Sequence, residues 1–173
     1  MACHGRLKTE SLEVIAGQFS GEFLQGMMER VSLLPDLTEL HLKGNFGPDD
    51  ALVLQHALMT ESAFTVLVID AINDEVAFEL ITHGLMLNEW IEDVILDNPA
   101  TSRNLQICGG VSAVLARNAT IRRLVIKLFH DDPELDNFRA LALIDPRLEI
   151  TVESAETSDS EQASFDVLDV RFY

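Results

Sequence analysis

The five histidines are the side chains best suited to acid–base or metal chemistry, and their spacing limits what they can do. They stand at positions His4, His41, His56, His83 and His130. A zinc-binding helix of the HExxH type needs two histidines four residues apart, and no pair in the chain has that spacing. The run His130-Asp131-Asp132 brings ligand types together, although an acidic loop is the commoner structure for such a run. We therefore predict no metal site.

The N-terminal residues and the cysteines offer two further routes to metal or redox chemistry. Removal of Met1 would leave Ala2-Cys3-His4, whose amine, amides and imidazole can hold Cu²⁺ or Ni²⁺ in a square plane. Many chains carry such a terminus without using it. Cys3 and Cys108 lie far apart and form no CxxC motif. We predict two reduced thiols, a reducing compartment and no cofactor.

Motifs for nucleophilic catalysis and phosphate binding do not occur in the sequence. Serine, histidine and aspartate are present without a GxSxG turn, and Gly109-Gly110 is not followed by a phosphate-binding glycine pattern. Asp93 and Asp97 of IEDVILDN lie at alternate positions of a predicted strand, an arrangement suited to a basic partner more than to a catalytic pair. We predict no catalytic residues and no enzymatic activity.

The elements that must position these residues follow from a spacing that recurs along the chain. Four segments, LTELHL, FTVLVI, IEDVIL and IRRLVI, have apolar residues at their first, fourth and sixth positions. They begin at Leu37, Phe64, Ile91 and Ile121, which are 27, 27 and 30 residues apart. This pattern predicts four equivalent strands.

The residues between the strands repeat as well. Six positions before the strand starts stand Val31, Leu58, Leu85 and Leu115, and ten positions before them stand Met27, Leu54, Ile81 and Val111. Residues four apart share a helix face, so each connection is predicted to be a helix with one apolar stripe. Ala57 and Gly84 are small enough for neighbouring helices to pack closely. Such units bury their apolar sides only when they stack.

The two ends of the chain are less regular, as expected for terminal caps. SLEVIAGQ is predicted as a degenerate first strand, followed by a helix over roughly residues 22–33, and the pattern ends in a strand near LEITV. We predict one domain over 1–173, with an N-terminal cap over 1–36, regular repeats over 37–147, and a C-terminal cap over 148–173 that contains an acidic, serine-rich loop. FDVLDVRFY repeats the spacing at Phe165, Leu168 and Val170, and it either adds a strand to the sheet edge or folds over the sheet.

These segments resemble a known family. LTELHLKGN followed by DDALVLQHAL, together with GVSAVLARNATIRRL, is similar to the leucine-rich repeats of the ribonuclease-inhibitor type over roughly residues 12–152. The resemblance implies an α/β solenoid of horseshoe shape, with a parallel sheet on the concave face and helices on the convex face, in a family whose members mostly bind other proteins. Asn45 fits the family asparagine, whereas Asn73 lies one place late and Pro99 and Phe129 occupy the position in the next two repeats, which weakens the expected asparagine ladder.

The residues between the core positions of each strand are predicted to face the concave side, because side chains alternate along a strand. They form three rows: Glu39, Val66, Asp93 and Arg123; His41, Val68, Ile95 and Val125; and Lys43, Asp70, Asp97 and Lys127. The middle row is mostly apolar and should face solvent between charged rows, the layout of a protein interface. The alternatives are that these residues serve strand propensity or are covered by the C-terminal segment. We predict that the twelve bind a partner, which contacts the basic patch of Arg123, Val125 and Lys127 first.

The charge of the chain is strongly acidic, with 12 basic and 29 acidic residues and a net charge of −17. Such a field repels nucleic acid, so the predicted partner is a protein, and a basic one is compatible. Acidity that merely keeps the chain soluble is the alternative. No apolar run approaches the ~18 residues of a membrane span, and no secretory signal is recognisable, so we predict no membrane contact and a cytoplasmic location, with export by a dedicated secretion system as the alternative.

The sequence therefore predicts a non-enzymatic protein-interaction module, acting as an adaptor, an inhibitor or a secreted effector. Two alternatives remain open at this point. One is a self-associating structural module that forms a homodimer through its sheet edges. The other is a metal-binding or enzymatic protein.

Overall fold

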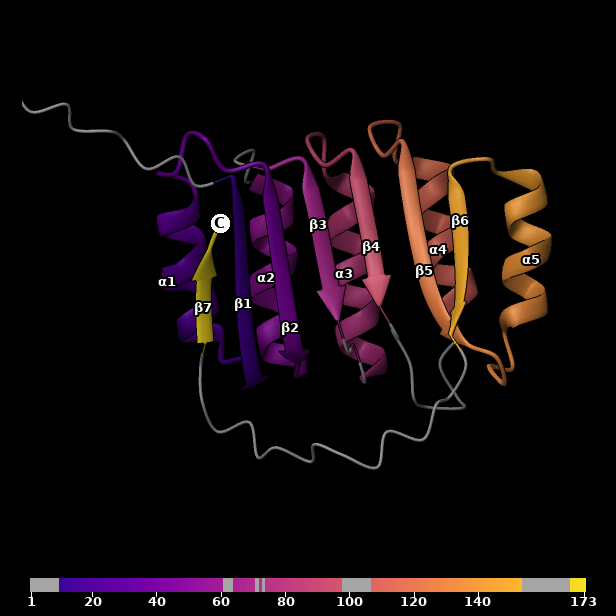
Figure 1. The fold of residues 1–173 in the computed structure, drawn as a ribbon, viewed down its shortest axis with the longest axis horizontal. Helices are drawn as coiled ribbons and strands as arrows, with labels where there is room; N and C mark the ends of the chain where they lie inside the picture. The colour runs from indigo at the N-terminus through magenta and orange to yellow at the C-terminus, as the bar shows by residue number, and fades with distance from the viewer. Residues whose placement is uncertain (1–9, 61–63, 71, 73, 98–106, 154–168) are drawn as a thin grey trace, which may run out of the picture.

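A computed structural model describes residues 10–60, 64–70, 72, 74–97, 107–153 and 169–173. Within these residues the chain forms an α/β fold with a seven-stranded open sheet in the order β6-β5-β4-β3-β2-β1-β7. The five helices of the described residues lie behind the sheet in Figure 1, and these residues place no helix on the side toward the viewer. The α/β class that the sequence predicts is confirmed.

Strands and helices alternate along the chain from the first strand to the sixth. The strands are β1 (Ser11–Gln18), β2 (Glu39–Asn45), β3 (Val66–Asp70), β4 (Asp93–Asp97), β5 (Arg123–Phe129), β6 (Leu148–Glu153) and β7 (Asp169–Phe172). The helices are α1 (Gly21–Val31), α2 (Pro48–Thr60), α3 (Glu75–Leu87), α4 (Ile107–Arg117) and α5 (Leu135–Ile144). Neighbouring strands from β1 to β6 are parallel.

The core positions of the predicted strands pair in register across β2 to β5. One row contains Leu40, Leu67, Val94 and Leu124, and the next contains Leu42, Ile69, Leu96 and Ile126. None of the eight is more than 1% exposed. The steps of 27, 27 and 30 residues thus place equivalent residues side by side, and the four predicted strands are confirmed.

The predicted apolar stripe of the helices is buried except at Met27 of α1, which is half-buried. Val31, Leu58, Leu85 and Leu115 are at most 4% exposed, and Leu54, Ile81 and Val111 are fully buried. Gly84 lies where α2 and α3 approach each other, since a Cβ at this position would stand 3.1 Å from the Cα of Gln55. Within the described part of the chain, no helix has both the length and the apolar character that crossing a membrane requires.

Local sequence sets where the helices begin. Pro48 is the first residue of α2, where its missing N–H costs no helical hydrogen bond. The side chains of Ser20 and Asp74 cap α1 and α3 by accepting hydrogen bonds from the backbone N–H of Phe23 at 3.3 Å and of Ala77 at 2.9 Å. These caps fix the direction in which each helix leaves its strand.

The C-terminal strand lies beside the first strand of the chain. Leu12 to Ile15 of β1 pair with β7 in antiparallel register, and the N–H of Tyr173 donates to the carbonyl of Ser11 at 3.0 Å. Of the two roles predicted for FDVLDVRFY, its described residues take the one at the sheet edge (Figure 1). Several residues named in the sequence predictions lie outside the described ranges: Cys3, His4, Asn73, Pro99, Phe165, Leu168 and the acidic segment 154–164.

Candidate functional site

The twelve predicted partner-binding residues lie together on the helix-free side of the sheet, here called the open face. The pairing of β2 to β5 sets them in the three predicted rows: Glu39, Val66, Asp93 and Arg123; His41, Val68, Ile95 and Val125; Lys43, Asp70, Asp97 and Lys127. Burial alternates along β2, β3 and β4, because every second residue points into the helix layer. The open face is therefore built by strand alternation alone.

The middle of the open face holds only apolar and acidic side chains. We call this the central patch: Val66, Val68 and Asp70 of β3 with Asp93, Ile95 and Asp97 of β4. All six are half-buried. Val68 is the in-register neighbour of Ile95, and Asp70 is that of Asp97. Strands in a sheet lie about 4.8 Å apart, so each pair presents a single surface to a ligand.

A lysine flanks the carboxylates of the central patch on each side. Lys43 Nζ lies 3.6 Å from Asp70 Oδ2, and Lys127 Nζ lies 2.5 Å from Asp97 Oδ2. Burial raises the pKa of Asp70, Asp97 raises it further, and Lys43 offsets only part of this. The hydrogen bond to Asp97 raises the pKa of Lys127. Asp97 thus has a close counter-ion, whereas the charge of Asp70 is compensated incompletely.

The basic patch predicted at Arg123 and Lys127 is not a free positive surface. Arg123 donates hydrogen bonds from Nε and Nη2 to the two carboxylate oxygens of Glu149 at 3.0 and 2.9 Å, and Lys127 is paired with Asp97. The hydrogen bonds from Arg123 lower the pKa of Glu149. Neighbouring strands thus supply an acid to each cation, and first contact of a partner with this patch stays a prediction.

Val125 also differs from its prediction. It was expected to face solvent in the apolar row, but it is only 5% exposed. Its in-register neighbours are Ile95 on β4 and Glu149 on β6, and the Arg123–Glu149 ion pair runs directly beside it. The exposed part of the apolar row therefore ends at Ile95.

The described histidines do not converge on one another. His41 lies on the open face with Nε2 3.3 Å from Glu39 Oε2, and His83 lies on α3 with Nδ1 2.7 Å from Gln55 Nε2. His56 is exposed on α2, and His130 lines a polar hollow after β5. No group of three or more His, Cys, Asp or Glu side chains able to hold a metal ion occurs in the described ranges.

A second hollow, which the sequence did not indicate, lies at the N-terminal edge of the sheet. It is a groove of about 290 Å³ between α1 and the strands β1 and β7. Its lining is mostly apolar and includes Leu12, Phe23, Met27 and Val170. β7 contributes Val170 to this groove, through a pairing between the two ends of the chain that periodicity cannot reveal.

Two buried asparagines, whose hydrogen bonds the sequence did not predict, connect successive units. Asn118 is 4% exposed, and its Nδ2 donates to the carbonyls of Leu85 at 2.6 Å and Asn88 at 2.8 Å. Its Oδ1 accepts from the N–H groups of Thr120 at 2.7 Å and Ile121 at 2.8 Å. Asn88 repeats this arrangement, with Nδ2 2.5 Å from the carbonyl of Leu58. Their position three residues before Ile91 and Ile121 was the available signal.

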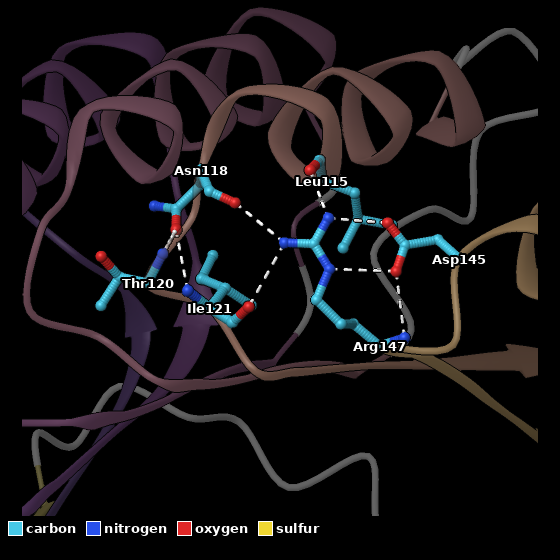
Figure 2. Close-up of polar contacts among 6 residues, drawn as sticks. All are labelled: Leu115, Asn118, Thr120, Ile121, Asp145 and Arg147. Atoms are coloured by element: carbon cyan, nitrogen blue, oxygen red, sulfur yellow. Dashed lines mark hydrogen bonds and ion pairs between the residues drawn. The ribbon is translucent and has the colours of Figure 1, made fainter.

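An aspartate–arginine pair takes over this role in the last unit, as Figure 2 shows. Asp145 Oδ1 accepts from the N–H of Arg147 at 3.0 Å, as Asn118 Oδ1 accepts from Thr120. Arg147 donates to the carbonyls of Asn118, at 2.9 Å, and of Leu115. These carbonyls correspond to those of Asn88 and Leu85 in the preceding unit. One ion pair thus replaces one carboxamide, and the hydrogen bond from Arg147 lowers the pKa of Asp145.

Comparisons of the chain with known protein families, with curated proteins and with solved structures each found no match. What the open face does is therefore inferred from its own residues.

Proposed function

We propose that the chain is a short leucine-rich-repeat solenoid of the ribonuclease-inhibitor-like type and that it binds a partner protein through the open face. The consecutive strand order, the in-register leucine rows and the asparagines between units support the repeat interpretation. In this proposal the open face is the concave side of the horseshoe and the helices form the convex side.

The observation that carries the binding proposal is the half-buried apolar strip of Val66, Val68 and Ile95 on the open face. Apolar side chains that stay in contact with water on a flat sheet gain free energy when a partner covers them. Polar pairs border the strip, with Glu39–His41 toward β1 and the ion pair Arg123–Glu149 toward β6. An apolar centre with a polar rim is the arrangement of protein interfaces.

The binding is proposed to be non-enzymatic. The polar groups that border the strip are engaged with each other as ion pairs: Lys43 with Asp70, Lys127 with Asp97, and Arg123 with Glu149. These contacts join cations to carboxylates and pair no nucleophile with a base. Adaptor, inhibitor and secreted effector are the roles that such a surface supports.

Site-specific photo-crosslinking in the native cell tests the binding proposal. A benzoylphenylalanine in place of Val68 should crosslink a partner protein, because Val68 lies in the middle of the strip. The same probe in place of Leu52, which is 53% exposed on α2, is the control and should not. The combined change Val66→Thr and Ile95→Thr keeps β-branched residues that suit a strand but replaces apolar groups with hydroxyls. It should weaken partner binding about tenfold, since buried apolar contacts supply most interface energy. Equal crosslinking from positions 68 and 52 would contradict the proposal.

Self-association is a second candidate, favoured by the exposed end of the molecule at α5. Leu143 and Ile144 are 91% and 80% exposed there, next to the sheet edge formed by β6. Exposed edges and apolar side chains promote pairing between copies. Sedimentation velocity over a range of concentrations distinguishes the two candidates. A dimer of the native chain that becomes a monomer in the variant Leu143→Lys/Ile144→Lys would support self-association.

A further inference from the structure

We infer that the partner of the open face is a protein segment with one apolar and one basic side chain, an inference that rests on the proposed function. The apolar side chain lies over Val68 and Ile95. The basic side chain, a lysine or an arginine, lies between Asp70 and Asp97. The juxtaposition of an apolar pair with a carboxylate pair on the same two strands carries this assignment. Such a segment is basic and amphipathic.

The spacing of the two pairs suits neighbouring residues of one segment. Val68 and Asp70 are two residues apart on β3, as Ile95 and Asp97 are on β4. A strand rises about 3.4 Å per residue, so the apolar and the acidic pair lie about 7 Å apart on the face. Side chains two apart in an extended segment, or three to four apart on a helix, cover that separation.

The charges of the central patch favour a basic partner. Its two strands contribute the carboxylates of Asp70, Asp93 and Asp97 and no cation. The lysines beside them, Lys43 and Lys127, belong to the outer strands. Over the whole chain the net charge of −17 adds a long-range attraction for a basic segment.

The state of Asp70 agrees with this assignment. Its carboxylate is half-buried, lies beside that of Asp97, and has its nearest cation, Lys43, at 3.6 Å. Burial and Asp97 together raise the pKa of Asp70 above its ordinary value despite Lys43. A cation supplied by the partner would stabilise both carboxylates at once, which is a gain that an acidic or neutral segment does not offer.

A second copy of this chain is a poorer occupant of the same face. Its own central patch carries the same three carboxylates, and its net charge is also −17. Two such faces in contact would bring like charges together, at a cost of several kcal/mol for close juxtaposition.

Selection from a random peptide library displayed on phage, with the full chain immobilised, tests the inference. The chain should enrich peptides in which lysine or arginine lies within four residues of a large apolar residue. Synthetic versions of the enriched peptides should bind the variant Asp70→Asn/Asp97→Asn about tenfold more weakly than the native chain. The charge-matched control Glu79→Gln/Glu89→Gln removes two exposed carboxylates elsewhere and should bind them nearly as the native chain does. Circular dichroism verifies that each variant is folded.

The outcomes separate the inference from the proposed function. One outcome is that the enriched peptides lack basic residues and that their binding is weakened by Val68→Thr/Ile95→Thr but not by Asp70→Asn/Asp97→Asn. This outcome would overturn the inference and leave the open face as a protein-binding site. Enrichment of peptides that neither variant affects would overturn both. If the chain dimerises and Asp70→Asn/Asp97→Asn makes the dimer tighter, the face would be assigned to a second copy. This result would likewise overturn the inference.

Discussion

At the scale of single residues, the carboxylates of the open face differ in how close their counter-ions lie. Asp97 is hydrogen-bonded to Lys127 at 2.5 Å and Glu149 to Arg123 at 2.9 Å, whereas Lys43 stands 3.6 Å from Asp70. The predicted rows place Lys43 beside Asp70 and Asp97 beside Lys127, but they do not include Glu149 of β6, which pairs with Arg123. The cations of the predicted basic patch are therefore present on the open face, but each is paired with an acid.

The charge of Asp70 should make stability depend on pH in a definite direction. Because its pKa is raised in the folded protein, the folded state holds this proton more tightly than the unfolded state does. Stability linked to Asp70 is therefore full below the ordinary value of 3.8 and is lost as pH rises through the raised pKa. An asparagine at position 70 does not titrate. The thermal midpoint of Asp70→Asn, compared with that of the native chain, should therefore increase as pH rises from 3 to 7.

Thermal unfolding followed by circular dichroism across this pH range measures the difference. Lys43 lowers the pKa of Asp70, so Lys43→Met should extend the affected range to higher pH. The Lys43–Asp70 pair itself contributes little, because the Lys43 side chain is exposed to solvent. A difference between Asp70→Asn and the native chain that stays constant with pH, or that grows toward low pH, would contradict the prediction.

At the scale of elements, the sequence predicts the strands and helix stripes well because both follow from one spacing. Leu40, Leu67, Val94 and Leu124 are equivalent in the sequence and are neighbours in the sheet. The connections between units were predicted less well. The resemblance places the asparagine ladder after the strands, and Asn45 there donates to the carbonyl of Gly17 at 3.0 Å. The asparagines that connect the units, Asn88 and Asn118, lie before the strands. An apolar pattern does not mark polar residues whose role is to satisfy backbone groups.

Removal of the Asn118 side chain should therefore destabilise the protein through two elements at once. Asn118→Ala leaves the carbonyls of Leu85 and Asn88 and the N–H groups of Thr120 and Ile121 without these partners in a buried position. Each unsatisfied buried group costs about 1–3 kcal/mol, and partial rearrangement reduces the sum, so we expect a loss of about 2–4 kcal/mol in the free energy of unfolding. Urea denaturation measures it. Asn137→Ala, at an exposed position of α5, is the matched control, and equal midpoints for the two variants would refute the structural role of Asn118.

At the scale of the whole molecule, the sheet is finished at its two edges in different ways. The edge of β1 is covered by β7, whereas β6 forms the opposite edge of the described sheet. Periodicity predicts the order of β1 to β6, since neighbours in sequence become neighbours in space. It cannot predict the partner of β7, because that pairing joins the last strand to the first across the full width of the sheet. The groove beside α1 was invisible from the sequence for the same reason.

Removal of residues 169–173 should destabilise the fold and leave β1 as an unpaired edge strand. The truncation removes the pairing of β7 with Leu12 to Ile15, the hydrogen bond from Tyr173 to Ser11, and the Val170 wall of the groove. With net contributions of about 1 kcal/mol for each lost hydrogen bond, we expect a loss of about 2–4 kcal/mol in the free energy of unfolding. The exposed edge of β1 should also promote association, since an unpaired strand is a template for another.

Thermal unfolding and sedimentation velocity of the truncated chain measure these two effects. A synthetic peptide of residues 165–173 added in trans should raise the midpoint and reverse the association, because it restores the missing strand. A peptide with the same composition in scrambled order is the control, since only the native order alternates apolar and charged residues at the positions that pair with β1. An unchanged midpoint and a monomeric truncated chain would show that β7 adds nothing to the edge, and the groove would then owe its shape to α1 and β1 alone.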